Sequence, residues 1–299
     1  MALLTATQGT PHRIWSLLQI LGARGEALSR EEIEGWMNPE IHIQGESARS
    51  EKSAVGQTID ATVGLGFIDR NAGLLGLSIK EVPKNAEVLA DEIYNRLAST
   101  AEDDADSVIL EALALVLAKS NAEKACHWAS SIARDPLADF LRDYLGPGHD
   151  GKTYDRFNPT KLTSWKRWLE FLGLWRDLSH GMSQPVLTKR LGREISRIGL
   201  ATDAEIDAVD FLAKLRVHMP FVDGGRLYEQ ACERLKLPSR REELSVCFSA
   251  ALRELDTSGT IKLIRRGDAS GGVSLSRNKF SKMGTFHAVK LLSGCSSNV

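Results

Sequence analysis

Arginine and lysine side chains are concentrated near the end of the 299-residue chain, between residues 239 and 282. They flank a short alternating segment, Thr260 to Arg265, whose pattern is typical of a β-strand. Cations gathered on a strand pair and its neighbouring helix can neutralise several phosphates of a nucleic acid. For Arg240 and Arg241 an alternative stays open, in which both pair with nearby glutamates on a solvated helix face. The predicted basic edge consists of Arg240, Arg241, Lys262, Arg265, Arg266, Arg277, Lys279 and Lys282.

A second group of cations, Lys161, Lys166 and Arg167, alternates with Trp165 and Trp168. Aromatic rings beside cations can stack on the bases of a single strand. The two tryptophans also have the spacing of a buried helix face, and we favour this core interpretation. The three cations would then be exposed and would face phosphate. As the partner we expect DNA, and duplex DNA more than single-stranded DNA.

One stretch, Gly146 to Thr153, matches the phosphate-loop pattern and would place Lys152 on a nucleotide. The residues before it have helical spacing, and Asn158-Pro159 leaves no room for the helix that must follow, so we interpret it as a linker. The acidic residues 102–106 are typical of a solvated helix start, where negative charge suits the helix dipole. With no paired histidines, close cysteine pairs or nucleophile elbow, the sequence predicts no enzyme, cofactor or metal site.

Two segments would position these residues, and each has three helices followed by a hairpin, the order of a winged helix. In residues 10–79 a capping box at Ser29 to Glu32 opens the second helix. In residues 203–277 we expect helix starts at Asp203 and at a capping box beginning at Ser239. A strand is expected over residues 260–265, with a turn and a return strand at residues 273–276. The expected buried positions of the first and third helices are Ile206, Val209, Leu212, Ala213, Val217, Leu244, Cys247, Phe248, Ala251 and Leu255.

The predicted fold is therefore mainly α with small β-hairpins, with winged-helix modules around a helical middle domain. We expect an N-terminal winged helix over residues 1–80 and a helical domain over 81–150. A helix at residues 158–172 and a hairpin over 173–187 indicate a possible further winged module within 151–200. The C-terminal winged helix would occupy residues 201–299.

The net charge of −1 conceals strong segregation along the chain. Residues 81–150 carry −8, whereas residues 151–198 and 236–299 carry +6 each. This pattern favours an acidic N-terminal half that docks other protein subunits and basic surfaces that meet a polyanion. The four cysteines are scattered, and no apolar run is long enough to span a bilayer, so we expect a cytoplasmic protein with reduced, structural thiols and no membrane partner.

A tryptophan-rich segment and the order of the modules resemble the G protein of the bacterial Dpd cluster. That cluster inserts 7-deazaguanine derivatives into DNA and restricts unmodified DNA. The resemblance covers most of the chain and implies a context of phage defence beside helicases and nucleases, but no catalytic motif and no mechanism. The residues that carry it are Asn158-Pro159-Thr160-Lys161, Trp165, Trp168, Phe171-Leu172-Gly173 and Trp175.

The leading hypothesis is a non-catalytic, DNA-binding assembly subunit of a bacterial DNA-modification or anti-phage complex. One alternative is a winged-helix transcriptional regulator, which would be a homodimer on a palindromic site. Another is a scaffold whose modules bind protein alone.

Overall fold

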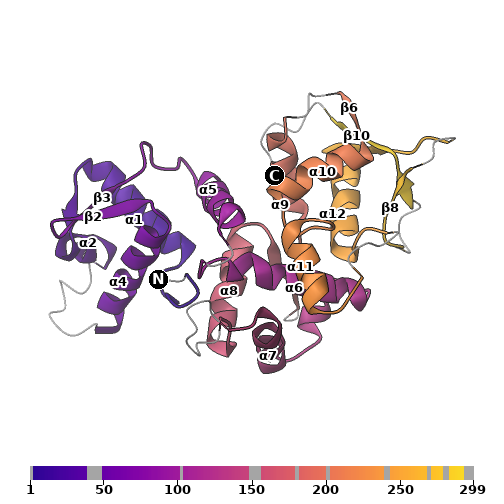
Figure 1. Ribbon diagram of the computed structural model, residues 1–299. Helices are drawn as coiled ribbons and strands as arrows, with labels where there is room; N and C mark the ends of the chain where they lie inside the picture. Colours follow the sequence, from indigo (N-terminus) through magenta and orange to yellow (C-terminus); the bar gives the residue numbers. More distant parts are fainter. Residues whose placement is uncertain are drawn as a thin grey trace. The chain divides into compact units, whose positions relative to one another are not determined.

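The computed structural model describes residues 3–38, 49–101, 104–147, 156–178, 182–199, 203–238, 243–267, 271–278 and 283–292. The chain forms two compact units, Met1–Ser107 with Thr160–Phe171, and Val108–Pro159 with Leu172–Val299. Helices dominate both units, and the strands form small antiparallel sheets (Figure 1). The predicted fold class, mainly α with small β-hairpins, is therefore confirmed.

Among its described residues, the first unit begins with the predicted order of three helices and a hairpin. A short strand that the sequence pattern missed, β1, pairs with β3 and gives a sheet of order β1-β3-β2. Two residues are too few to show alternation, which is why the pattern missed it. The elements of this unit are α1 (Pro11–Arg24), β1 (Leu28–Ser29), α2 (Arg30–Met37), α4 (Arg49–Gly64), β2 (Ile68–Asn71), β3 (Leu74–Leu77), α5 (Ala86–Ser99) and α8 (Pro159–Phe171).

Local sequence signals set the helix starts in this unit. The predicted capping box is present, since Ser29 Oγ accepts from the Glu32 amide at 3.2 Å and Glu32 Oε2 accepts from the Ser29 amide at 2.8 Å. These bonds hold Arg30 at the first position of α2. At α1, the Thr10 side chain accepts from the Arg13 amide, which satisfies a free N–H of the first turn.

The second unit is organised around α6, an apolar helix buried on almost all sides. It packs against α7, α11 and α12. Its elements are α6 (Val108–Ala122), the 3₁₀ turn η1 (Trp128–Ser130), α7 (Arg134–Leu145), β4 (Trp175–Asp177), β5 (Ser183–Pro185), α9 (Thr188–Arg197), β6 (Glu205–Asp207), α10 (Ala208–His218), α11 (Arg226–Arg234), α12 (Val246–Thr257), β7 (Ile261–Ile264), β8 (Val273–Ser274), β9 (Thr285–Phe286) and β10 (Ala288–Leu291). The predicted hairpin over residues 173–187 is observed as the pair β4-β5.

One buried carboxylate ties three segments of this unit together. Glu111 of α6 accepts two hydrogen bonds from Arg156, at 2.7 and 3.0 Å, and one from Arg234 of α11 at 3.0 Å. Glu111 and Arg156 are almost fully buried. Because each charge has an opposite charge and directed hydrogen bonds, the cost of burying the ions is offset.

The expected start of α10 was wrong. Residues 205–207 form β6, and the helix begins at Ala208 with Asp207, not Asp203, as its N-cap. The buried face is displaced accordingly, and Val209 and Val217 are 54% and 78% exposed. The cause is tertiary, because β6 is held by pairing with β10, some 80 residues later in the chain. Exposure also contradicts Ala213 as a core position, whereas Leu212 is buried as predicted.

The return strand of the C-terminal hairpin was also assigned wrongly. β7 pairs with β10, and β10 lies between β6 and β7 in the sheet. The predicted return segment instead forms β8, which pairs with β9. Turn signals near residues 267–272 favoured the nearest strand, but a longer excursion separates β7 from its partner.

The third helix of this region starts later than predicted. α12 begins at Val246, so Arg240 and Arg241 do not lie in its first turn. The Asp223 carboxylate accepts from the Ser245 amide at 2.7 Å and from Ser245 Oγ at 2.6 Å, which fixes the chain immediately before the helix. The predicted buried face is confirmed for Cys247, Phe248, Ala251 and Leu255, while Leu244 is buried but precedes the helix.

Candidate nucleic-acid interface

The cations of the basic edge on and after β7 are exposed and partly neutralised by the chain itself. Lys262 lies 3.6 Å from Asp256, and its side chain is 58% exposed. Arg266 lies 3.0 Å from Glu205, and both side chains are about half exposed. The exposed pair of Arg266 and Glu205 contributes little to stability, typically about 0 to 1 kcal/mol, so Arg266 can exchange this carboxylate for another anion.

Two arginines of the basic edge have no carboxylate partner within the part of the chain that the structure describes. Arg265 follows β7, Arg277 follows β8, and both are exposed. A single residue, His287, joins β9 to β10; its Nδ1 accepts from the Arg266 amide at 3.2 Å, and its own amide donates to Ile264 O at 2.8 Å. The two small sheets that carry these arginines are thus connected through β9 and β10.

A buried guanidinium holds the segment that carries Arg277. Arg253 of α12 donates from Nη2 to Ser276 O at 2.7 Å and to Met283 O at 3.0 Å. Burial lowers the pKa of Arg253. This contact could not be predicted from the sequence, because an arginine on an otherwise apolar helix looks the same whether it reaches solvent or a backbone carbonyl.

The remaining predicted cations divide between two situations. Arg240, Arg241, Lys279 and Lys282 lie outside the described residues. Lys161, Lys166 and Arg167 lie on α8; Arg167 is exposed, whereas the two lysines are half-buried and engaged in interactions. These three belong to the first unit and the basic edge to the second. The core interpretation of the α8 tryptophans is confirmed, since Trp165 and Trp168 are at most 1% exposed.

The phosphate-loop match falls mostly outside the described residues, which resume at residue 156. On its N-terminal side the structure has α7, which ends at Leu145 and is followed by Gly146 with a positive φ of 73°. A functional phosphate loop follows a β-strand and leads directly into a helix. The predicted helical spacing before the motif is therefore confirmed.

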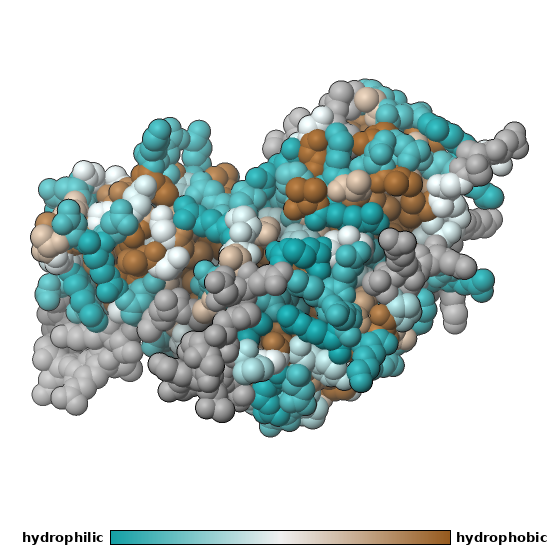
Figure 2. Space-filling model, in the orientation of Figure 1, coloured by the Kyte–Doolittle hydropathy of each residue, from teal (hydrophilic) through white to brown (hydrophobic). Residues whose placement is uncertain are grey.

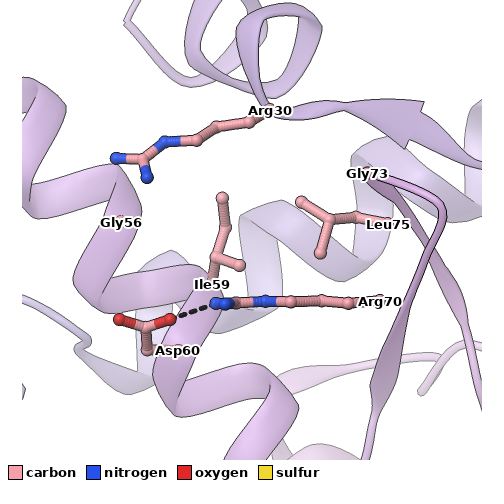
Figure 3. A pocket seen from close by; sticks show the side chains of 7 residues that line it. All are labelled: Arg30, Gly56, Ile59, Asp60, Arg70, Gly73 and Leu75. Carbon is pink, nitrogen blue, oxygen red and sulfur yellow. Dashed lines mark hydrogen bonds and ion pairs between the residues drawn. The ribbon is translucent and has the colours of Figure 1, made fainter.

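A pocket of about 300 Å³ lies in the first unit, between α2, α4 and the β2-β3 hairpin (Figure 3). Arg30 extends along one side and Arg70 along the other, with the apolar side chains of Ile59 and Leu75 between them. A Cβ at Gly56 would lie 2.9 Å from Arg30 Nη2, so a larger residue there would displace the Arg30 guanidinium from its present position.

The cations of this pocket are balanced by carboxylates. Arg70 forms an ion pair with Asp60, and Arg30 Nε donates to Glu34 at 2.9 Å. The pocket therefore has two guanidinium groups but no excess positive charge to favour a polyanion. Arg30 was missed as a lining residue because its position in a capping box explained it as an ordinary helix start.

The chain was compared with models of known protein families. Residues 1–269 match the family described as DpdG-like. The chain belongs to this family. The expected resemblance to the G protein of the Dpd cluster is thereby confirmed. Neither the curated proteins nor the solved structures gave a match.

Within the described residues of this DpdG-like protein, no helix is long and apolar enough to cross a membrane. The longest apolar run, which begins at Val108, is the buried helix α6. Its apolar character is explained by packing inside the second unit.

Proposed function

We propose that this DpdG-like protein is a non-catalytic subunit of a bacterial, cytoplasmic DNA-modification or anti-phage machine, and that its second unit binds the phosphate backbone of duplex DNA. The observation that supports DNA contact is the pair Arg265 and Arg277, exposed guanidinium groups without a carboxylate partner among the described residues. Membership of the DpdG-like family supports the DNA-modification context.

We further propose that both units contain winged-helix modules. Each has three helices and a three-stranded sheet whose last strand lies in the middle, in the orders β1-β3-β2 and β6-β10-β7. The first strand follows the first helix in one unit and precedes it in the other. In such a module the third helix and the wing meet the duplex, here α12 and the strands that follow it.

The paired cations of the basic edge fit the same function. When Arg266 approaches a phosphate, it exchanges the exposed carboxylate of Glu205 for it at little cost. Lys262 can turn toward a phosphate in the same way, and Asp256 then keeps its hydrogen bond from the Leu263 amide. Release of counterions from DNA then favours association, and this gain falls as salt rises. Binding through these residues would be strongly salt-dependent and would carry little sequence information.

The test compares two double charge reversals of equal charge. Arg265→Glu with Arg277→Glu should weaken duplex binding about tenfold or more at moderate salt and reduce the slope of log affinity against log salt by about 1.8, at about 0.9 per phosphate contact. The matched control is Lys214→Glu with Lys236→Glu, two exposed cations of the second unit outside the basic edge. Equal losses in both variants, or no loss in the first, would refute this surface.

A protein-docking scaffold is the second candidate, supported by an exposed apolar face on α10. Val209 and Val217 share this face at i and i+8. Figure 2 shows hydrophobic surface where Figure 1 places α10. Failure of the wild-type protein to retain duplex DNA at low salt would favour the scaffold.

A stable homodimer protecting a palindromic site would instead favour a transcriptional regulator, and loss of nucleotide retention in Lys152→Ala would favour an enzyme.

A further inference from the structure

The pocket of the first unit has an apolar part and a polar part. Ile59 of α4 and Leu75 of β3 form the apolar part, between the extended side chains of Arg30 and Arg70. Both arginines direct their guanidinium groups toward α4 (Figure 3). The volume of about 300 Å³ lies at the lower end of the range of small-molecule pockets, about 300 to 1,000 Å³. A compact ligand with one apolar and one polar end matches this division.

One end of the Arg30 guanidinium group is available to a ligand. Its Nε donates to Glu34 Oε1 at 2.9 Å, and the side chain is 55% exposed. Within the residues that the structure describes, neither Nη1 nor Nη2 of Arg30 donates a hydrogen bond. The two N–H groups at the end of a planar guanidinium match the two oxygens of a carboxylate. Arg30 can therefore bind a carboxylate while its ion pair with Glu34 stays intact.

Gly56 gives the Arg30 guanidinium its place beside α4. A Cβ at this position would lie 2.9 Å from Arg30 Nη2 and 3.6 Å from its Cζ. Since these atoms belong to the end of a flexible side chain, an alanine would push the guanidinium aside and leave the backbone of α4 in place. Alanine is also the more favourable residue inside a helix. Position 56 thus allows the pocket to be changed without removing a charge or weakening the helix.

The charges of the pocket favour a ligand with a single negative charge. Arg70 forms an ion pair with Asp60, and Arg30 forms one with Glu34, so two cations are matched by two carboxylates. A ligand with two or more negative charges would be repelled by Asp60 and Glu34, whereas one carboxylate obtains charge-assisted hydrogen bonds from Arg30. Charge therefore selects a monocarboxylate over a phosphate monoester.

We propose that this pocket binds a monocarboxylate with a compact apolar body. The carboxylate accepts hydrogen bonds from Nη1 and Nη2 of Arg30, and the apolar body lies against Ile59 and Leu75. A free organic acid and the last residue of a peptide both present this chemistry. The pocket lies in the first unit, so this inference does not depend on DNA binding by the second unit.

The experiment titrates phenylacetate into the intact protein and follows binding by ligand-observed NMR. The wild-type protein should bind phenylacetate saturably, and Arg30→Met should weaken binding about tenfold or more, because the charge-assisted hydrogen bonds are lost. Arg24→Met is the matched control, since Arg24 is an exposed arginine of the same unit that pairs with Glu26 and does not line the pocket. Absence of saturable binding by the wild-type protein, or equal losses in the two variants, would overturn the proposal.

Two further measurements separate carboxylate recognition from simple apolar burial. Phenylacetamide, which has the same ring but no charge, should bind about tenfold more weakly than phenylacetate. Gly56→Ala should weaken phenylacetate binding several-fold, while its unfolding midpoint stays at or above that of the wild type. Equal binding of the amide, tighter binding of phenyl phosphate, or unchanged affinity in Gly56→Ala would contradict the assignment of the carboxylate to Arg30.

The source of the carboxylate is tested with N-acetylphenylalanine, which mimics the last residue of a peptide. Tighter binding of this compound than of phenylacetate assigns the pocket to a peptide C-terminus, whereas weaker binding assigns it to a free acid. Both compounds should lose affinity to a similar extent in Arg30→Met, because both place a carboxylate against its guanidinium group. Loss of affinity for neither compound in this variant would refute the site.

Discussion

At the scale of single residues, buried ionisable groups set how this protein responds to pH. Asp106 accepts a hydrogen bond from the Leu3 amide at 2.6 Å. Burial raises its pKa from 3.8 to about 6, opposed by that hydrogen bond and reinforced by the Asp104 carboxylate. The acidic pattern of residues 102–106 indicated a solvated helix start, because no neighbouring residue shows that the N-terminal segment covers Asp106.

The raised pKa of Asp106 predicts how the stability of the fold changes with pH. The folded protein binds the proton of the Asp106 carboxyl group more tightly than the unfolded chain does. The stabilisation from this proton is therefore complete below about pH 4 and is lost as the pH rises through about 6. Asp106→Asn keeps an acceptor for the Leu3 amide but cannot ionise. The difference in unfolding free energy between the variant and the wild type should therefore change by up to about 3 kcal/mol between pH 4 and pH 7. Denaturant unfolding at both pH values measures it, and parallel curves would contradict the assignment.

Glu111 provides a second residue-scale prediction. Glu111→Gln removes the charge that compensates two arginines, one of them buried, so the free energy of unfolding should fall by about 3 kcal/mol. The control is Glu123→Gln in the same helical region, whose ion pair with Lys119 is exposed and should contribute less than about 1 kcal/mol. Urea unfolding of the two variants compares them directly, and equal effects would show that Glu111 is not a compensating charge.

At the scale of elements, the sequence predicted the features that depend on neighbouring residues and missed those that depend on residues far along the chain. The capping box at Ser29 and the buried tryptophans of α8 depend on neighbours within one or two helical turns, and both were predicted correctly. The start of α10 and the partner of β7 both depend on β10, whose four residues follow a long excursion. No periodicity in residues 203–277 could contain that information.

The same distinction applies to the basic edge. Sequence located Lys262 on a strand and Arg266 close beside it, but did not reveal their neutralisation by Asp256 and Glu205. It also did not reveal that Arg253 holds the segment bearing Arg277. Which cation keeps its charge exposed is decided by contacts across the sheet. Those contacts involve residues up to some 60 positions apart.

Arg253 provides the prediction that belongs to this scale. Arg253→Met should leave α12 folded but free the carbonyl groups of Ser276 and Met283, which loosens the β8-β9 segment. Exchange of the Leu275 amide, which donates to Gly284 O, should accelerate about tenfold or more. Lys262→Met on the neighbouring strand serves as control and should leave that exchange rate unchanged. Equal protection in Arg253→Met and wild type would show that the guanidinium does not anchor this segment.

At the scale of the whole molecule, charge counted along the chain overstates charge on the surface. Residues 151–198 carry +6, yet this count includes Arg156, which is buried and compensates Glu111 from outside the block. The block is therefore less basic toward solvent than its composition indicates. The basic edge of the second unit differs, because those of its cations that the structure describes are exposed even where they are paired.

The family match and the fold end at different places, which gives a whole-molecule prediction. The match ends at residue 269, but β10 is the central strand of its sheet, and Phe286, Ala288 and Val289 are fully buried. In a chain ending after residue 282, β6 and β7 lose their pairing with β10. The burial of Phe286 and Val289 is lost as well, which lowers the free energy of unfolding by about 4 kcal/mol from these side chains alone. Amide exchange of Ile261–Ile264 should then lose its protection, whereas a chain ending after Leu292 should keep it. Retained protection in the shorter chain would mean that β7 is held by α12 and not by β10.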